Sequence, residues 1–443
     1  MKKTYLFIVC SLYILQAAGQ YRMATEPEPS GIRVFTTADE AFTLWLDGFV
    51  HLEGGVFFGY YEDYDPIPNG GVVRNARLAL KTAFADGWSA LFEADFSKLK
   101  PRITQAFIQY SGIHNLYIKA GHFESLFSME GALLPREQAF LEKPMVITAM
   151  VPVDLLGIQF STNQYWFMGS LGISFDKALY PRQNPKADSI LTASFDSRSV
   201  MAKAVAMPFV NRKDLGLHLG AGASYKFPVK DPVTGSYPAI RYRLGNVSYI
   251  NRHQYLDTYV INNIRSQFLL KGEGGFYYKG LRIQGEYIHN MTNLGKPLTG
   301  VDGPVSVLNF KGFYVQSGFL LFGGRQRYDT TTGLFMNPSR GRKWGDVELL
   351  ARYDYLDLNY DPIKGGASQN YTAGITYYIN DHVKLMANYI YTDNDRYANG
   401  AGQFLIGHDA YGYPSADYSQ IIETIREAGV DFHTISLRFE VTF

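Results

Sequence analysis

The chain has 443 residues, with 42 Lys and Arg against 41 Asp and Glu, and it is rich in Tyr (33), Phe (30) and Gly (43). The near-equal numbers of basic and acidic residues argue against a nucleic-acid-binding protein and against action by long-range electrostatic attraction. The length alone would suggest several soluble domains. Abundant Tyr, Phe and Gly instead favour a membrane β-barrel, in which aromatic residues form interfacial girdles and glycines ease curvature. A soluble all-β protein is the alternative.

Residues 1–20 predict a secretory signal peptide. Lys2 and Lys3 precede an apolar run at 5–15, and small residues follow at 17–19, which is the order of charge, apolar core and cleavage site in such peptides. The run is too short for a membrane helix, which needs about 20 residues. Cys10, the only cysteine, lies inside it, so the mature chain is predicted to have no disulfide.

Residues 21–43 are predicted to form a periplasmic leader. The acidic, proline-containing stretch 26–31 (EPEPSG) is typical of a flexible linker. Contact of this stretch with a periplasmic partner is the alternative. The barrel itself is predicted at 44–443.

The first strands show the expected alternation. In 72–84, Leu78 and Leu80 fall on one face and Arg77 and Lys81 on the other. The next alternating run, 88–98, follows after only Ala-Asp-Gly, which indicates a hairpin turn. The charged face is therefore predicted to point away from lipid.

The C-terminal segment has the clearest period of two. One face carries Ile435, Leu437, Phe439, Val441 and Phe443, and the other carries Thr434, Ser436, Arg438, Glu440 and Thr442. A final strand that ends in phenylalanine resembles the signal read by the outer-membrane barrel assembly machinery. Phe443 is therefore predicted to contact that machinery.

Connection lengths predict sixteen strands, because bacterial barrels combine short periplasmic turns, long outer loops and an even strand count. The predicted strands are 44–60, 72–84, 88–98, 102–110, 115–121, 154–162, 164–174, 198–209, 214–226, 264–278, 281–291, 307–321, 346–357, 369–379, 382–392 and 432–443. Two connections fit this scheme poorly. The stretch 322–345 is long for a periplasmic turn, and 239–250 resembles a strand although it falls in an outer loop. If both were strand-forming, the count would be eighteen.

Several segments also occur in the order expected of one family: GVVRNARL (71–78), GHFES (121–125), GIQ (157–159), LRIQGEY (281–287), GDVELLARY (345–353) and GITYYIN (374–380). Over nearly all of its mature length the chain resembles the phosphate-selective porin O and P family. The resemblance implies an all-β, sixteen-stranded antiparallel barrel in the bacterial outer membrane, usually a homotrimer, whose third outer loop folds inward. Residues 122–153 would be this constriction loop.

Phosphate selectivity is a separate question, since it depends on positive residues at the narrowing. The resemblance implies lysine where this chain has Glu124 and arginine where it has Asp154. Within 122–153 the acids Glu124, Glu130, Glu137 and Glu142 outnumber Arg136 and Lys143. These departures argue against an anion-selective constriction.

Charged residues on the polar faces are the candidates for the pore lining. The basic candidates are Arg77, Lys81, Lys119, Arg136, Lys143, Lys271, Arg282, Arg352 and Lys384, and the acidic ones are Glu93, Asp95, Glu124, Asp154, Glu286 and Glu348. Such side chains can replace part of an ion's hydration and so impose selectivity. The alternative is that the basic residues pair with neighbouring acids.

No catalytic, metal-binding or cofactor-binding pattern is recognisable. The sequence has no His-Glu-x-x-His spacing and no Gly-x-Ser-x-Gly elbow. We therefore predict a non-enzymatic porin embedded in outer-membrane lipid, which passes small hydrophilic solutes, with phosphate and other small anions as candidates. A barrel plugged by its own loops, acting as an adhesin or a structural partner, is the main alternative, and a barrel enzyme with scattered lumen residues is another.

Overall fold

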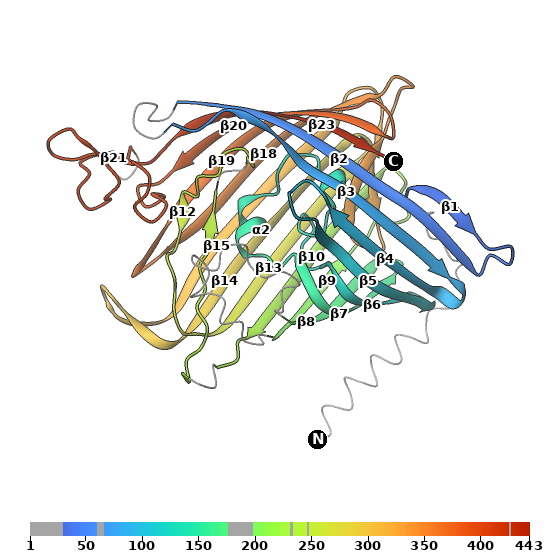
Figure 1. Cartoon of the computed structure of the whole chain (residues 1–443), viewed down its shortest axis with the longest axis horizontal. Coiled ribbons are helices and arrows are strands. Elements are labelled where there is room, and N and C mark those ends of the chain that lie inside the picture. Colours follow the sequence, from blue (N-terminus) through green and yellow to red (C-terminus); the bar gives the residue numbers. More distant parts are fainter. Residues whose placement is uncertain (1–29, 60–65, 176–197, 231–233, 246–247, 425–426) are drawn as a thin grey trace. The chain divides into compact units, whose positions relative to one another are not determined.

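The alternating segments form a closed antiparallel barrel of sixteen strands in the described part of the chain (Figure 1). The computed structural model describes residues 30–59, 66–175, 198–230, 234–245, 248–424 and 427–443. The predicted signal peptide and most of the region before residue 30 therefore lie outside the described residues. The barrel strands are β2 (Phe42–Phe58), β3 (Gly70–Phe84), β4 (Trp88–Asp95), β5 (Arg102–Ile113), β6 (Leu116–Glu124), β7 (Asp154–Gln164), β8 (Phe167–Phe175), β9 (Arg198–Ala206), β10 (Leu215–Phe227), β13 (Ile264–Tyr278), β14 (Leu281–Gly300), β15 (Gly303–Leu320), β18 (Asp346–Tyr360), β19 (Ile363–Tyr378), β20 (Val383–Asn394) and β23 (Phe432–Thr442).

Pairing of the first and last barrel strands closes the sheet. β2 pairs with β23 in the register Phe49↔Thr442 to Phe58↔His433, and the two strands lie side by side in Figure 1. The predicted faces of β23 are correct, because Leu437 is 57% exposed on the outside whereas Arg438 is 3% exposed on the inside. Every predicted strand has its counterpart in the barrel.

The pairing of β2 with β23 also explains why position 48 is a glycine. The backbone N–H of Phe443 donates to the Gly48 carbonyl at 3.0 Å, and a Cβ added at Gly48 would lie 2.6 Å from the Phe443 ring. Glycine at position 48 therefore makes room for the terminal aromatic ring. On the N-terminal side of Gly48, the same edge of β2 pairs with β1 (Ile32–Thr36), which lies within the predicted leader.

Two of the connections left between the predicted strands are largely strand, so the predicted strand boundaries were wrong there. The stretch 292–306 is mostly the continuation of β14 and β15, which turn at 301–302, and 358–368 is mostly the continuation of β18 and β19, which turn at 361–362. Beyond the membrane both faces of a hairpin can meet water or other loops. The hydrogen-bond ladder therefore continues after the apolar alternation has ended.

The two poorly fitting connections are not barrel strands, so the count is sixteen. In 322–345, β16 (Arg325–Asp329) and β17 (Leu334–Ser339) form a separate two-stranded sheet, here called the inner hairpin. In the outer loop that contains 239–250, β11 (Arg243–Leu244) pairs only with β12 (Leu256–Asp257). A further two-residue pair, β21 (Gly407–His408) and β22 (Pro414–Ser415), lies in the last outer loop.

Residues 125–153, here called the inner loop, lie within the barrel. The loop contains the 3-10 turn η2 (Pro135–Glu137) and the short helix α2 (Met145–Met150), and a second 3-10 turn, η1 (Ala85–Gly87), links β3 to β4. Met145, Val146 and Ile147 of α2 are buried in a hydrophobic cluster that includes Phe310 of β15 and Leu356 of β18. In Figure 1 α2 is seen within the ring of strands. No helix among the described residues is long and apolar enough to cross a membrane.

Candidate solute path

The tip of the inner loop is anchored to the barrel wall by Glu286 of β14. The Glu286 carboxylate accepts hydrogen bonds from Ser128 Oγ at 3.0 Å and from the backbone N–H groups of Met129 and Glu130 at 3.2 and 2.8 Å. Tyr314 of β15 donates to the same carboxylate at 2.8 Å. Hydrogen bonds to an ionised acceptor are the stronger kind, so Glu286 holds the tip firmly.

The next part of the inner loop faces the wall formed by β2 and β3. Asp47 of β2 receives Arg136 Nη1 of the inner loop at 2.6 Å and also pairs with Lys81 of β3. One wall carboxylate thus joins a loop cation to a wall cation. This triad marks the periplasmic part of the charged interior.

Two further ion pairs continue along the wall. Arg74 pairs with Glu142 of the inner loop through hydrogen bonds of 3.0 and 3.1 Å. Arg77 pairs with Glu93 of β4 at 2.9 Å and lies 3.7 Å from Asp95. Burial alone would raise the pKa of Glu142, but the adjacent Arg74 guanidinium outweighs it and lowers the pKa below the ordinary glutamate value.

These wall groups keep contact with water. Arg74 is 26% exposed, Glu142 20%, Lys81 16% and Arg136 13%. By contrast, Lys203, Lys271 and Glu273, which form ion pairs beside the tip of the inner loop, are 0% exposed. The charged side chains that keep exposure thus lie where the inner loop faces β2 to β4, and this row of side chains is here called the wall path.

Several predicted pore residues face the interior but are covered. Lys271 pairs with Glu273 and Glu286, Arg282 with Glu348, Arg352 lies 3.8 Å from Glu130, and Lys384 pairs with Glu440. The inner loop and the inner hairpin lie over these pairs. That any of them meets a permeating solute stays a prediction.

The remaining predicted residues lie in the strands that flank the inner loop or in the loop itself. Lys119 Nζ is 4.5 Å from the centre of the Phe107 ring and 5.6 Å from that of Phe123. Lys143 donates to the Gly131 carbonyl at 2.6 Å and so closes the loop on itself. Glu124 and Asp154 are opposite each other in the β6–β7 register, and the side chain of Asp154 is outside the described part.

Sequence reasoning missed Asp47 and Arg74. Asp47 could have been found, because it shares the inward parity of His51 in β2, and both are buried. Arg74 is the extra residue of a β-bulge, between Val73 paired with Leu52 and Asn75 paired with His51. A bulge resets the alternation, so no periodic pattern could place Arg74 inside.

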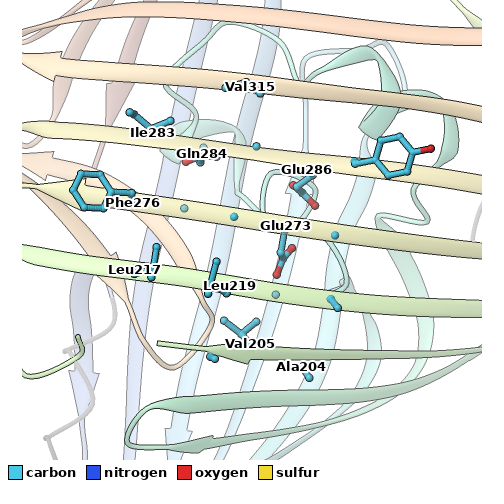
Figure 2. Close-up of a pocket in the computed structure, with 18 of the residues that line it drawn as sticks. Ala204, Val205, Leu217, Leu219, Glu273, Phe276, Ile283, Gln284, Glu286 and Val315 are labelled. Carbon is cyan, nitrogen blue, oxygen red and sulfur yellow. The ribbon is translucent and has the colours of Figure 1, made fainter. Parts of the chain in front are cut away.

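A depression of 1140 Å³ lies elsewhere, on the wall formed by β9, β10 and β13 to β15. Figure 2 labels its aliphatic lining residues Leu219, Ile283 and Val315, which are exposed on the outward face, together with Glu273 and Glu286 on neighbouring strands. The exposed lining is apolar and suits lipid rather than a hydrophilic solute. Among the described residues, no group of three or more His, Cys, Asp or Glu could hold a metal ion.

Comparison with known proteins decides the family. The model of the family described as phosphate-selective porin O and P matches residues 47–408. The chain belongs to this family. Porin O of Pseudomonas aeruginosa is 23% identical over 404 residues, which cover 84% of this chain and 87% of that protein. The protein is thus a porin of the bacterial outer membrane, a channel for small solutes.

Solved structures agree with the barrel fold. An anion-selective porin from Comamonas acidovorans has a TM-score of 0.52 at 12% identity, covering 91% of this chain and 100% of that one. The trimer form of OmpT from Vibrio cholerae has a TM-score of 0.51 at 10% identity, with the same coverage. At such identities the likeness concerns the fold alone.

Proposed function

We propose that small hydrophilic solutes cross this porin along the wall path, with residues 122–153 as the constriction. The observation that carries the proposal is the contrast in side-chain exposure between the two charged regions. Arg74, Arg77, Lys81 and Arg136 keep partial exposure, whereas the ion pairs beside Glu286 have none. A permeating ion needs polar groups that stand in for its hydration and remain in contact with water.

The wall path is expected to be weakly selective. Its four cations face the acids Asp47, Glu93, Asp95, Glu137 and Glu142, and each cation lies within 4 Å of at least one of these carboxylates. Opposed charges at such distances largely cancel each other's field on a passing ion. Phosphate and other small anions therefore pass without a dedicated site, as do small cations.

The remaining features of the proposal concern processing and assembly. Residues 1–20 are removed as a signal peptide, the barrel assembly machinery contacts the strand that ends in Phe443, and the mature chain forms a homotrimer without enzymatic activity. The trimer is supported by the trimer form of the Vibrio cholerae structure. The assembly signal is supported by the outward row of apolar side chains that ends at Phe443.

One observation favours a second function. The outer half of the barrel interior is packed by a continuous hydrophobic cluster that joins α2 to outer-loop residues such as Tyr255, Phe404 and Ile406. Packing of this kind fits a barrel plugged by its own loops that serves as an adhesin or a structural partner.

Conductance in planar bilayers separates the two functions. The purified protein should produce discrete channels, and the reversal potential in a salt gradient should be close to zero. Phosphate should carry current without blocking chloride. Absence of conductance from folded protein would support the plugged barrel, and block of chloride by phosphate would contradict the weak selectivity.

A further inference from the structure

The inner hairpin occupies part of the barrel interior and binds the wall. Gln326 Nε2 donates to Glu348 Oε1 at 2.8 Å and to the Gly280 carbonyl at 3.1 Å. Tyr328 hydrogen bonds to His218 Nδ1 at 2.5 Å. Both wall side chains, Glu348 and His218, are buried. A connection between two barrel strands has therefore folded back among the inward-facing groups.

The inner hairpin also contacts the inner loop. Leu334 and Phe335 share a hydrophobic cluster with Leu126, Met129 and Leu133 of the loop. At the other end of the hairpin, the backbone N–H of Asn337 donates to Glu137 Oε2 at 2.7 Å, and Asn337 Nδ2 donates to the Arg136 carbonyl at 3.0 Å. The two inserted segments thus meet through both an apolar and a polar contact.

Lys384 of β20 joins the wall to both segments. Its ammonium donates to the Arg136 carbonyl at 2.7 Å, to the Gln138 carbonyl at 3.4 Å and to Asn337 Oδ1 at 3.4 Å. It also pairs with Glu440 of β23 at 3.2 Å, and its side chain is 4% exposed. A buried ammonium surrounded by oxygens from three segments is a rigid point, because moving any segment would leave a buried charge short of partners.

The residue fixed in this way is the loop cation of the wall path. The Arg136 carbonyl is held by Lys384 and Asn337, while its guanidinium reaches Asp47 at 2.6 Å. The same residue thus carries the backbone contacts to the wall and the inner hairpin and the side-chain contact to Asp47. Movement of this backbone segment would therefore move the base of the guanidinium side chain relative to Asp47.

We propose that Lys384 and the inner hairpin, through Asn337, are positioning elements that set the place of Arg136 in the wall path and thereby the ion preference of the channel. The inference rests on the proposed function, because it takes the wall path as the route of solutes. It assigns to the periplasmic connection 322–345 a part in selectivity, although none of its residues needs to touch the solute.

The test compares reversal potentials and single-channel conductances of Asn337→Ala and Arg136→Ala with those of the unaltered protein. Arg136→Ala removes a cation beside Asp47, so permeation should shift toward cations. Asn337→Ala changes no charge but removes one of the two hydrogen bonds that hold the Arg136 carbonyl. It should shift the permeability ratio in the same direction by about twofold or more. Lys384→Met is the second variant and should shift the ratio likewise.

Thr330→Ala is the matched control, because Thr330 lies in the same connection, in the turn between β16 and β17, and outside the contacts with Arg136 and Lys384 described above. The two strands of the hairpin form a sheet of their own, so substitutions at 330 and 337 remove no hydrogen bond of the barrel sheet. Heat-modifiable migration in gels will therefore show whether each variant is folded. Thr330→Ala should match the unaltered channel.

The outcomes separate the two claims. If Arg136→Ala shifts the ratio but Asn337→Ala and Lys384→Met do not, the positioning role is wrong and the wall path stands. If Arg136→Ala is itself silent, the wall path is wrong and the inference falls with it. An equal shift in Thr330→Ala and Asn337→Ala would also overturn the positioning role, since the contact with Arg136 would then be irrelevant.

Discussion

Replacement of Asp47 by Asn should convert the weakly selective channel into an anion-preferring one. Asp47 is the shared partner of Lys81 and Arg136, so its neutralisation removes one negative charge that these two cations share. One uncompensated charge acts on an ion about 4 Å away with roughly 1 kcal/mol in water. Screening at about 0.1 M salt reduces this to about 0.7 kcal/mol.

That energy predicts the size of the effect. Anion permeation should rise about threefold and cation permeation should fall by a similar factor, so the permeability ratio should change by about tenfold. The assay is the reversal potential across planar bilayers in a potassium chloride gradient. Raising the salt concentration should shrink the shift, because exposed charges are screened more strongly.

A matched control removes the same charge elsewhere. Asp381 is 83% exposed and pairs with Arg340, in the turn between β19 and β20. Asp381→Asn should leave the reversal potential unchanged. The reasoning would be refuted by an Asp47→Asn channel that is folded yet as unselective as the unaltered protein, or by equal shifts in the two variants.

Two further predictions concern the inner loop. Glu286→Gln keeps the shape of the side chain but weakens its hydrogen bonds to residues 128–130 by about 2 kcal/mol. Chemical labelling of a cysteine introduced at the buried Ala132 should therefore accelerate on the order of 30-fold. Glu427→Gln in an exposed outer loop is the control, and equal labelling rates in the two variants would contradict the anchoring role of Glu286. The pKa of Glu142 is lowered by Arg74, so their ion pair is fully present above the ordinary carboxyl pKa and is lost as the pH falls through the lowered value. The contribution of this pair to conductance should therefore change only below about pH 4, and Glu142→Gln should abolish that acid change. A transition near neutral pH that Glu142→Gln removes would show that the pKa has the opposite shift.

The barrel was predictable from sequence because the membrane imposes a period of two on every strand. Ile435 and Leu437 face outward while Ser436 and Arg438 face inward, as the alternation predicts. The ends of the hairpins were not predictable, since β14 continues to Gly300, where no lipid enforces the pattern. The hydrogen-bond ladder persists without any apolar signal.

The interior was only partly predictable. The inward direction of Arg77 and Lys81 follows from the alternation of side chains along β3. Their partners Glu93 and Asp47 lie on other strands, and one sequence does not determine the exact register between strands. The sequence indicated the inner hairpin only as a connection, 322–345, that is long for a periplasmic turn. Its inward fold depends on tertiary contacts such as Tyr328 with His218, for which the sequence carries no local pattern.

The seam between β2 and β23 has a consequence for biogenesis. Inside the barrel it is joined by Arg438 and Glu53, which are 385 positions apart in sequence and 2.7 Å apart in space. The edge of β2 that pairs with β23 therefore stays unpaired until the last residues of the chain have been synthesised and delivered. Exposed strand edges can pair with other chains. A nascent chain that lacks residues 432–443 would therefore expose two unpaired strand edges at once, and the cell must shield both edges until the barrel has closed.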